Sequence, residues 1–176
     1  EDTEVVVRAA AALLKHRPTP LYGVDLCGGT GAVALGLCSL VPGLRMDSVE
    51  WMEEAFAFLE TNTRRFQEGR VRPVRGNVLD PSEALRLVPE KIDVLISNPP
   101  YIRAAEIAGL QEEVQQEPVT ALDGGGDGLD FYRAIADYWI PRVKPGGVVA
   151  VEIGEEQAEA VCELFAAAGV TGLSVH

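Results

Sequence analysis

The tetrapeptide Asn98-Pro99-Pro100-Tyr101 contains the residue types that most directly suggest chemistry. The two prolines supply no N–H, and each forces the residue before it toward extended backbone. The side-chain oxygen of Asn98 and the backbone carbonyl of Pro99 are therefore predicted to remain available as fixed acceptors. Such a pair can hold both N–H groups of a planar amide or aromatic amine and stabilise the positive charge that its nitrogen gains during attack. Pro100 stiffens this corner, and Tyr101 offers an aromatic face to a flat substrate group.

A glycine-rich turn follows the first apolar segment and predicts a cofactor site. In the stretch VDLCGGTGAVALGL, Gly28, Gly29 and Gly31 stand between an apolar strand and a helix of small residues. Glycine lets the backbone approach a ligand closely, and the N-terminus of the following helix offers free N–H groups. Glu50 ends the next predicted strand, about twenty residues on, where an acid usually binds a pair of ribose hydroxyls. The pattern indicates a nucleoside-bearing cofactor, with a tight turn that binds nothing as the alternative.

Two further features bear on the identity of the cofactor. Residues 29–34 also fit the G-x-G-x-x-A dinucleotide fingerprint, so a nicotinamide cofactor stays open. The Asn98 corner favours methyl transfer, because hydride transfer has no evident need for two fixed acceptors. Asp25 ends the first strand, where its carboxylate could accept hydrogen bonds from the turn or from a cationic amine, or could only brace the loop.

The elements that position these residues alternate along the chain between two apolar patterns. Helices are predicted over residues 3–16, 32–40, 53–68, 82–87, 129–143 and 155–168, and strands over 21–26, 45–50, 71–76, 92–97, 148–153 and 170–175. This alternation predicts an α/β, Rossmann-like, doubly wound fold with a mostly parallel sheet and helices on both faces. Thr3 is expected to cap the first helix, and Pro73 indicates an edge strand. The polar, glycine-rich segment 103–128 is predicted to be a functional or a mobile loop.

Composition limits the classes of function. The 176 residues fit one domain, and nothing in them indicates an obligate dimer, so we expect a monomer. Lys and Arg number 15 against 27 Asp and Glu, a net charge of -12 that disfavours direct nucleic-acid binding. We recognise no signal peptide and no run long enough to cross a bilayer, and we expect no membrane association. The scattered Cys27, Cys38 and Cys162 have no metal-ligand spacing, so we expect no metal and a cytoplasmic location.

Six stretches together resemble the HemK/PrmC family. They are Asp25–Gly31, Glu50, GNVLD (76–80), NPPYI (98–102), EPVTALDGGGDGLDFYRAI (117–135) and KPGGVVAVEIG (144–154), preceded by EDTE (1–4). Members of that family are methyltransferases that transfer a methyl group from S-adenosylmethionine to the glutamine side-chain amide in the Gly-Gly-Gln motif of class I peptide chain release factors. The resemblance implies a class I methyltransferase fold, S-adenosylmethionine as cofactor, S-adenosylhomocysteine as product and a release factor as partner.

The resemblance also implies a role for each site residue. Asn98, Pro99 and Tyr101 are expected to be catalytic, and Pro100 joins them in binding the substrate glutamine. The turn is expected to surround the methionine part of the cofactor, Glu50 to bind the ribose, and residues 77–78 to lie beside the adenine. The implied cofactor-binding residues are Asp25, Cys27, Gly28, Gly29, Thr30, Gly31, Glu50, Asn77, Val78 and Asn98.

Some features depart from the family pattern. Cys27 stands where the family usually has Gly, and Asn77 and Glu50 stand where it usually has Asp. The family's N-terminal helical docking domain and its last strand pair are not recognised within residues 1–176. We therefore interpret residues 1–176 as the catalytic domain.

Other readings of the same residues remain open. NPPY also occurs in amino-methyltransferases of DNA, so methylation of an exocyclic adenine amine in DNA or RNA is the alternative function. A nicotinamide oxidoreductase and a non-catalytic binding module are weaker alternatives. Glu117 and Asp123 are predicted to be solvated loop acids, with a role in framing the substrate loop as the alternative. Trp51 and Trp139 are predicted to be packing residues.

Overall fold

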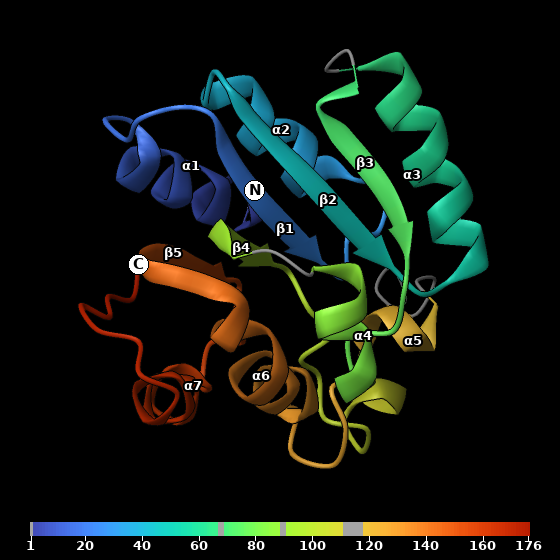
Figure 1. Cartoon of the computed structure of the whole chain (residues 1–176). Coiled ribbons are helices and arrows are strands. Elements are labelled where there is room, and N and C mark those ends of the chain that lie inside the picture. The colour runs from blue at the N-terminus through green and yellow to red at the C-terminus, as the bar shows by residue number, and fades with distance from the viewer. Residues whose placement is uncertain (1, 67–68, 89–90, 111–117) are drawn as a thin grey trace.

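The computed structural model describes residues 2–66, 69–88, 91–110 and 118–176, and their fold is built on one parallel sheet (Figure 1). The strands lie in the order β3-β2-β1-β4-β5. Their bounds are Leu21–Leu26 for β1, Leu44–Glu50 for β2, Val71–Arg75 for β3, Ile92–Ser97 for β4 and Val143–Val151 for β5. The chain proceeds outward from β1 to β3 and then returns to the other side of β1 with β4. This change of direction is the switch point at which open α/β sheets bind ligands.

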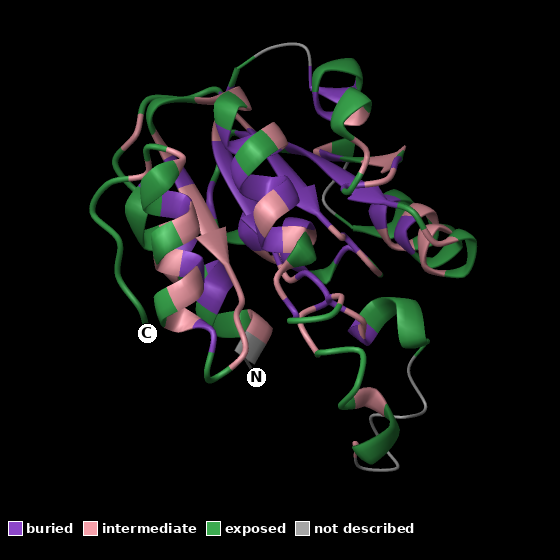
Figure 2. Cartoon of the chain, turned by 90° about the horizontal axis from the view of Figure 1, so that it is seen from below, coloured by how far each residue is buried: buried purple, intermediate pink, exposed green. Residues whose placement is uncertain are grey.

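Helices cover both faces of the sheet and enclose two apolar cores. Their bounds are Asp2–Leu14 for α1, Ala32–Leu40 for α2, Glu53–Arg65 for α3, Pro81–Leu87 for α4, Val119–Leu122 for α5, Asp130–Ala134 for α6 and Ala158–Ala167 for α7. On β1, Leu21 joins the core under α1 and α2, whereas Val24 and Leu26 join the core under α6 and α7. Side chains alternate along a strand, so one short strand supplies both cores. Figure 2 shows the buried strands between helices with exposed outer surfaces.

The structure confirms the predicted fold class and several elements. The observed bounds of β1, α2 and β4 are the predicted ones. The apolar run of β4 is buried on both faces, with Val94, Leu95 and Ile96 each 0% exposed, as expected of a central parallel strand. Pro73 lies in β3, which forms an edge of the sheet.

The predicted helix over 129–143 is wrong in its second half. Helix α6 ends at Ala134 and continues as a π-helical turn, η4 (Ile135–Trp139), and a 3₁₀ turn, η5 (Ile140–Arg142). Pro141 lacks the N–H that a longer helix needs, so the chain leaves the helix here. Strand β5 consequently starts at Val143, earlier than predicted, and its register with β4 is irregular.

Three other predictions of secondary structure are wrong. No strand forms over 170–175, where the described chain is irregular and residues 171–176 are exposed. Apolar alternation produces a strand only where a neighbour pairs with it. Thr3 is not an N-cap, because α1 already begins at Asp2. Helix α3 ends at Arg65, before the predicted end at residue 68.

Two buried aromatic residues connect the core under α6 and α7 to the segments that follow β3 and β5. The indole N–H of Trp139 donates to the carbonyl oxygen of Val78 at 2.9 Å, and the hydroxyl of Tyr132 donates to the carbonyl oxygen of Glu152 at 2.9 Å. Both side chains are 0% exposed, which confirms the packing role predicted for Trp139. These bonds hold Val78 and Glu152, which follow β3 and β5, in fixed positions.

Replacing Trp139 with Phe is expected to lower the free energy of unfolding by about 2–3 kcal/mol. The change leaves the Val78 carbonyl without its buried donor and removes packed volume. Urea denaturation of both proteins measures the difference. Trp51→Phe is the matched control, because Trp51 is 59% exposed and its replacement is expected to change stability by less than about 0.5 kcal/mol. Equal losses in the two variants would contradict this assignment.

Candidate active site

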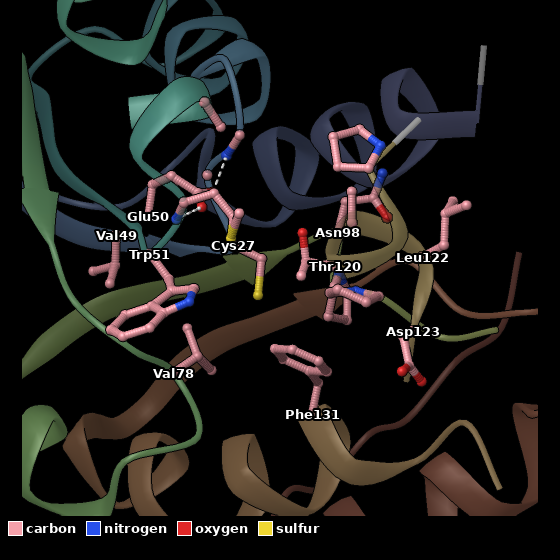
Figure 3. Close-up of a pocket in the computed structure, with 18 of the residues that line it drawn as sticks. Cys27, Val49, Glu50, Trp51, Val78, Asn98, Thr120, Leu122, Asp123 and Phe131 are labelled. Atoms are coloured by element: carbon pink, nitrogen blue, oxygen red, sulfur yellow. Dashed lines mark hydrogen bonds between the residues drawn. The ribbon is translucent and has the colours of Figure 1, made fainter. Parts of the chain in front are cut away.

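A cavity of about 850 Å³ opens at the carboxyl ends of the central strands. Parallel pairing places Leu26 of β1 beside Ser97 of β4, so the glycine turn and the NPPY corner leave the sheet next to each other. Figure 3 shows Glu50, Trp51 and Val78 on one side of this cavity and Asn98, Thr120 and Leu122 on the other. The predicted site residues that line it are Cys27, Gly28, Gly29, Thr30, Glu50, Asn77, Val78, Asn98, Pro99, Pro100 and Tyr101.

The glycine turn has a backbone that few other residues could form. Cys27, Gly29 and Gly31 have φ angles of 58°, 54° and 86°, in the left-handed region. A side chain at Gly28 would collide with Ser48. The Gly28 N–H donates to the Val49 carbonyl oxygen at 2.9 Å, which ties the turn to β2. The usual Gly at the position of Cys27 is thereby explained, since the backbone conformation is one that glycine adopts without strain.

Glu50 joins the end of β2 to the glycine turn. Its Oε2 accepts the N–H of Gly29 at 2.8 Å, and its Oε1 accepts the N–H of Met52 at 2.6 Å (Figure 3). The residue is 7% exposed and lines the cavity. Each carboxylate oxygen has a second lone pair, so Glu50 can brace the turn and still accept hydrogen bonds from a bound molecule.

Asp25 and Gly31 are predicted site residues that do not line the cavity. Asp25 is 0% exposed, and its Oδ2 accepts the hydroxyl of Ser48 at 2.9 Å. Burial raises the pKa of this carboxyl group to about 7, although the Ser48 hydrogen bond acts in the opposite direction. The Asp25 carboxylate thus ties the end of β1 to β2, and its contact with a cofactor stays a prediction. Gly31 precedes α2 and provides the left-handed turn into that helix.

The NPPY corner leaves β4 with two acceptors facing no described donor. The Asn98 Nδ2 group donates to Thr3 Oγ1 at 3.1 Å. In the described part of the chain, no hydrogen bond reaches Asn98 Oδ1 or the carbonyl oxygen of Pro99. The carbonyl oxygen of Tyr101 accepts the Gln157 Nε2 group at 2.9 Å, which fixes the exit of the corner. Asn98 and Pro99 thus line the cavity with two oxygens that no described donor reaches, while the chemical role of these oxygens remains a prediction.

Helix α5 forms the cavity wall on the side of the NPPY corner, and sequence analysis missed it. The Ile102 N–H donates to the Leu122 carbonyl oxygen at 2.9 Å, which joins α5 to the corner. Asp123 also lines the cavity and accepts the N–H of Gly125 at 2.9 Å, so it is not simply a solvated acid. Glu117 lies outside the described residues.

Trp51, Thr3 and Glu152 also line the cavity, although none was predicted to do so. Trp51 is 59% exposed rather than packed, which contradicts the role predicted for it. Its position directly after Glu50 was the available signal. Glu152 directly follows β5, so the strand-end argument applied to Glu50 could have identified it. Thr3 carried no signal, because its contact with Asn98 joins residues 95 positions apart.

The described residues that line the cavity include acidic side chains and no basic ones. Glu50, Glu54, Asp123 and Glu152 line it, and no Lys or Arg is among the described lining residues. The described chain contains no cluster of three or more His, Cys, Asp or Glu residues suited to a metal ion. Burial raises the pKa of the Cys27 thiol far above its ordinary value, so this group is an uncharged part of the lining. None of the described helices is long and apolar enough to cross a bilayer.

The parallel sheet, its helices on both faces and the cavity at the switch point define a Rossmann-like class I methyltransferase fold. A solved structure with this fold is the SAM-dependent methyltransferase from Agrobacterium tumefaciens, at a TM-score of 0.67 and 14% identity, which matches 97% of this chain and 50% of that protein. Residues 4–129 match the family model of the methyltransferase small domain, and the chain belongs to this family.

Curated relatives extend the comparison over nearly the whole chain. A release factor glutamine methyltransferase of Moorella thermoacetica is 39% identical over 96% of this chain and 58% of its own length. One of Geobacter sulfurreducens is 38% identical over 96% of this chain and 56% of its own length. The resemblance to release factor glutamine methyltransferases expected from the motifs is confirmed at the level of sequence similarity. This chain spans just under 60% of the length of these two relatives.

Cys27→Gly is expected to raise the free energy of unfolding by about 0.5–1 kcal/mol. Glycine relieves the left-handed strain at φ 58°, and this gain exceeds the entropy that glycine adds to the unfolded chain. Thermal and urea denaturation measure the change. Cys27→Ala is the matched control, because it removes the thiol but keeps the Cβ that causes the strain. A gain in the alanine variant and none in the glycine variant would refute this explanation.

Asp25→Asn is expected to make stability less dependent on pH between about 4 and 7. The carboxyl pKa is about 7 in the fold and 3.8 ordinarily, so ionisation of Asp25 lowers stability as pH rises through this window. The unfolding free energy of the variant minus that of the parent should therefore be larger at pH 8 than at pH 5. Urea denaturation at both pH values tests this. Asp80→Asn is the control, since the Ser82 hydroxyl lowers the pKa of Asp80 and this group is already ionised at pH 5.

Proposed function

We propose that this chain is the catalytic domain of an enzyme that methylates a glutamine side-chain amide in the Gly-Gly-Gln motif of a class I peptide chain release factor, using S-adenosylmethionine. One observation carries this proposal. Asn98 and Pro99 line the same cavity as the glycine turn and Glu50, and no described donor reaches Asn98 Oδ1 or the Pro99 carbonyl oxygen. The relatives named above support this choice of substrate.

The lining residues fit S-adenosylmethionine. The Glu50 carboxylate keeps free lone pairs for the ribose hydroxyls, and the turn at Gly28 and Gly29 admits a closely bound group. Val49, Val78 and Trp51 supply apolar surface for the adenine, which makes Trp51 an addition to the predicted set. The sulfonium of this molecule supplies an electrophilic methyl group. Among the described lining residues, four are acidic and none is basic, which suits a positively charged methyl donor.

In this proposal, the residues of the NPPY corner act on the amide of the substrate glutamine rather than on S-adenosylmethionine. A carboxamide nitrogen is a poor nucleophile, because its lone pair is delocalised into the carbonyl group. Asn98 Oδ1 and the Pro99 carbonyl oxygen would accept its two N–H bonds, orient the nitrogen and stabilise its growing positive charge. Tyr101 and Pro100 would hold the flat amide between them and exclude water. The nitrogen releases its proton after transfer, so no neighbouring histidine is needed beforehand.

The same two oxygens could hold the exocyclic amine of adenine, but the surroundings favour a protein substrate. A nucleic acid brings a phosphate backbone, which binds best where Lys or Arg is present. The described lining has none, and the net charge of the chain is -12. An uncharged glutamine loop carries no such penalty. We accordingly propose a release factor as the partner, a monomeric enzyme and a cytoplasmic site of action.

Asn98→Ala is expected to lower turnover by about 10²–10³-fold, because one of two fixed acceptors for the amide is lost. Affinity for S-adenosylmethionine should change by less than tenfold, since the glycine turn and Glu50 remain. The assay incubates the chain with a class I release factor and S-adenosylmethionine and quantifies the methylated Gly-Gly-Gln peptide by mass spectrometry. Calorimetry measures the affinity for the cofactor, with NAD as the competing candidate.

A release factor with alanine in place of the motif glutamine is the substrate control and should gain no methyl group. Methylation of an adenine-containing oligonucleotide, with none of the release factor, would replace this proposal by the nucleic-acid alternative. Unchanged turnover in the Asn98→Ala variant would reject the role of its side-chain oxygen.

A further inference from the structure

Helix α1 reaches the NPPY corner through a single hydroxyl group. Thr3 Oγ1 lies 3.1 Å from Asn98 Nδ2 and 3.1 Å from Glu152 Oε2, and all three residues line the cavity. These contacts join positions 95 and 149 residues apart in the sequence. Asn98 and Glu152 directly follow β4 and β5, whose last paired residues are Ser97 and Val151. The sheet therefore sets the positions of Asn98 and Glu152, and α1 supplies Thr3, which hydrogen-bonds to both.

We propose that Thr3 is a positioning residue that sets which end of the Asn98 amide faces the substrate. This inference rests on the proposed function, in which Asn98 Oδ1 accepts an N–H of the glutamine amide. Thr3 touches neither the amide of the substrate nor the transferred methyl group in this role. It acts only through Asn98.

The proton count of the three groups gives the orientation. A carboxylate has only acceptor sites, so the bond between Glu152 and Thr3 uses the single hydroxyl proton of Thr3. The Thr3 oxygen then has only lone pairs to offer Asn98. Asn98 must therefore present its NH₂ group to Thr3, and its Oδ1 points the other way. The orientation follows from this donor and acceptor count as well as from the Nδ2–Oγ1 distance of 3.1 Å.

A wrong orientation would be costly because the two ends of an amide have opposite character. With the amide turned over, Asn98 would present two N–H donors to the N–H of the substrate amide. Neither group could then accept from the other, and the positive charge on the nitrogen would be opposed rather than stabilised. When the Asn98 amide is already oriented before the substrate arrives, the activation barrier for methyl transfer is lower. The affinity for S-adenosylmethionine is not changed by this orientation.

Helix α1 is held firmly enough to serve this purpose. Val6, Val7 and Ala10 are 8%, 6% and 0% exposed and belong to the core that α1 shares with α2 and the sheet. The position of Thr3 is thus set by an apolar helix face one turn further along. The competing explanation is a structural tether, in which Thr3 only attaches the start of α1 to β5. The two explanations differ in kinetics, since a tether has no reason to affect kcat alone.

The test compares five variants of the chain with the parent. Thr3→Val keeps the shape of the side chain and removes the hydroxyl, whereas Thr3→Ser keeps the hydroxyl. Thr61→Val is the matched control, because the Thr61 hydroxyl donates to the Ala57 carbonyl oxygen on the exposed side of α3. Asn98→Ala is made alone and together with Thr3→Val. Release factor methylation is measured for kcat and for both KM values, and thermal unfolding is measured for each protein.

Thr3→Val is expected to lower kcat about ten- to a hundredfold, with both KM values within about threefold and the melting temperature nearly unchanged. Thr3→Ser and Thr61→Val should keep kcat within about threefold of the parent. Thr3→Val should cause no further loss in the Asn98→Ala background, because the residues act as one unit. An unchanged kcat in Thr3→Val, or an equal loss from Thr3→Val in both backgrounds, would overturn the inference.

The outcomes separate this inference from the proposed function. If the parent chain does not methylate the release factor, or Asn98→Ala turns over normally, the proposed function fails and Thr3 loses its role with it. If the parent is active and Asn98→Ala is not, an unaffected Thr3→Val variant rejects Thr3 alone. A fall in melting temperature that accounts for the lost activity of Thr3→Val assigns Thr3 to a structural tether and likewise rejects the inference.

Discussion

The pairing of β1 with β4 is the constraint on which the site depends. These strands are far apart in the sequence, yet they run parallel with Leu26 opposite Ser97. The residues that follow them, the glycine turn and the NPPY corner, must therefore emerge at the same edge of the sheet. In the proposed function, the glycine turn binds the nucleoside of the cofactor and the oxygens of the corner hold the substrate amide. A shift in register would separate these two halves, because successive residues of a strand lie about 3.3 Å apart.

Hydrogen bonds from neighbouring elements then hold each half in place. Glu50 ties the glycine turn to the end of β2, and Gln157 ties the exit of the corner to the segment before α7. Trp139 holds Val78 in place through a buried hydrogen bond from its indole N–H to the Val78 carbonyl oxygen. These three bonds tie the glycine turn, the exit of the corner and Val78 to other elements of the fold, which favours a site preorganised for its ligands. Preorganisation of this kind suits a reaction in which orientation and charge stabilisation do most of the work.

The acidic lining adds a second constraint. The cavity exposes carboxylates from Glu50, Glu54, Asp123 and Glu152, and the described lining contains no basic side chain to neutralise them. A site of this sign attracts a cationic donor and repels phosphate. In the proposed function, this charge favours a protein substrate over a nucleic acid, although the NPPY corner could hold the amide of one or the amine of the other.

Local sequence signals were sufficient for β1 to β4, the turn and the corner. The apolar run of β4, the glycines after β1 and the prolines at 99 and 100 each restrict the backbone through their own residue types, and the structure agrees with them. The packing partners of single side chains were not predictable in this way. Asp25 is buried beneath the turn, Trp51 lies exposed at the cavity, and Thr3 bonds across the sheet, because burial and partner choice depend on chain segments far away in sequence. Residue types thus establish which groups can do chemistry here, whereas folding alone establishes which of them meet, since only the register of the parallel strands and the packing of α1 bring those distant positions together.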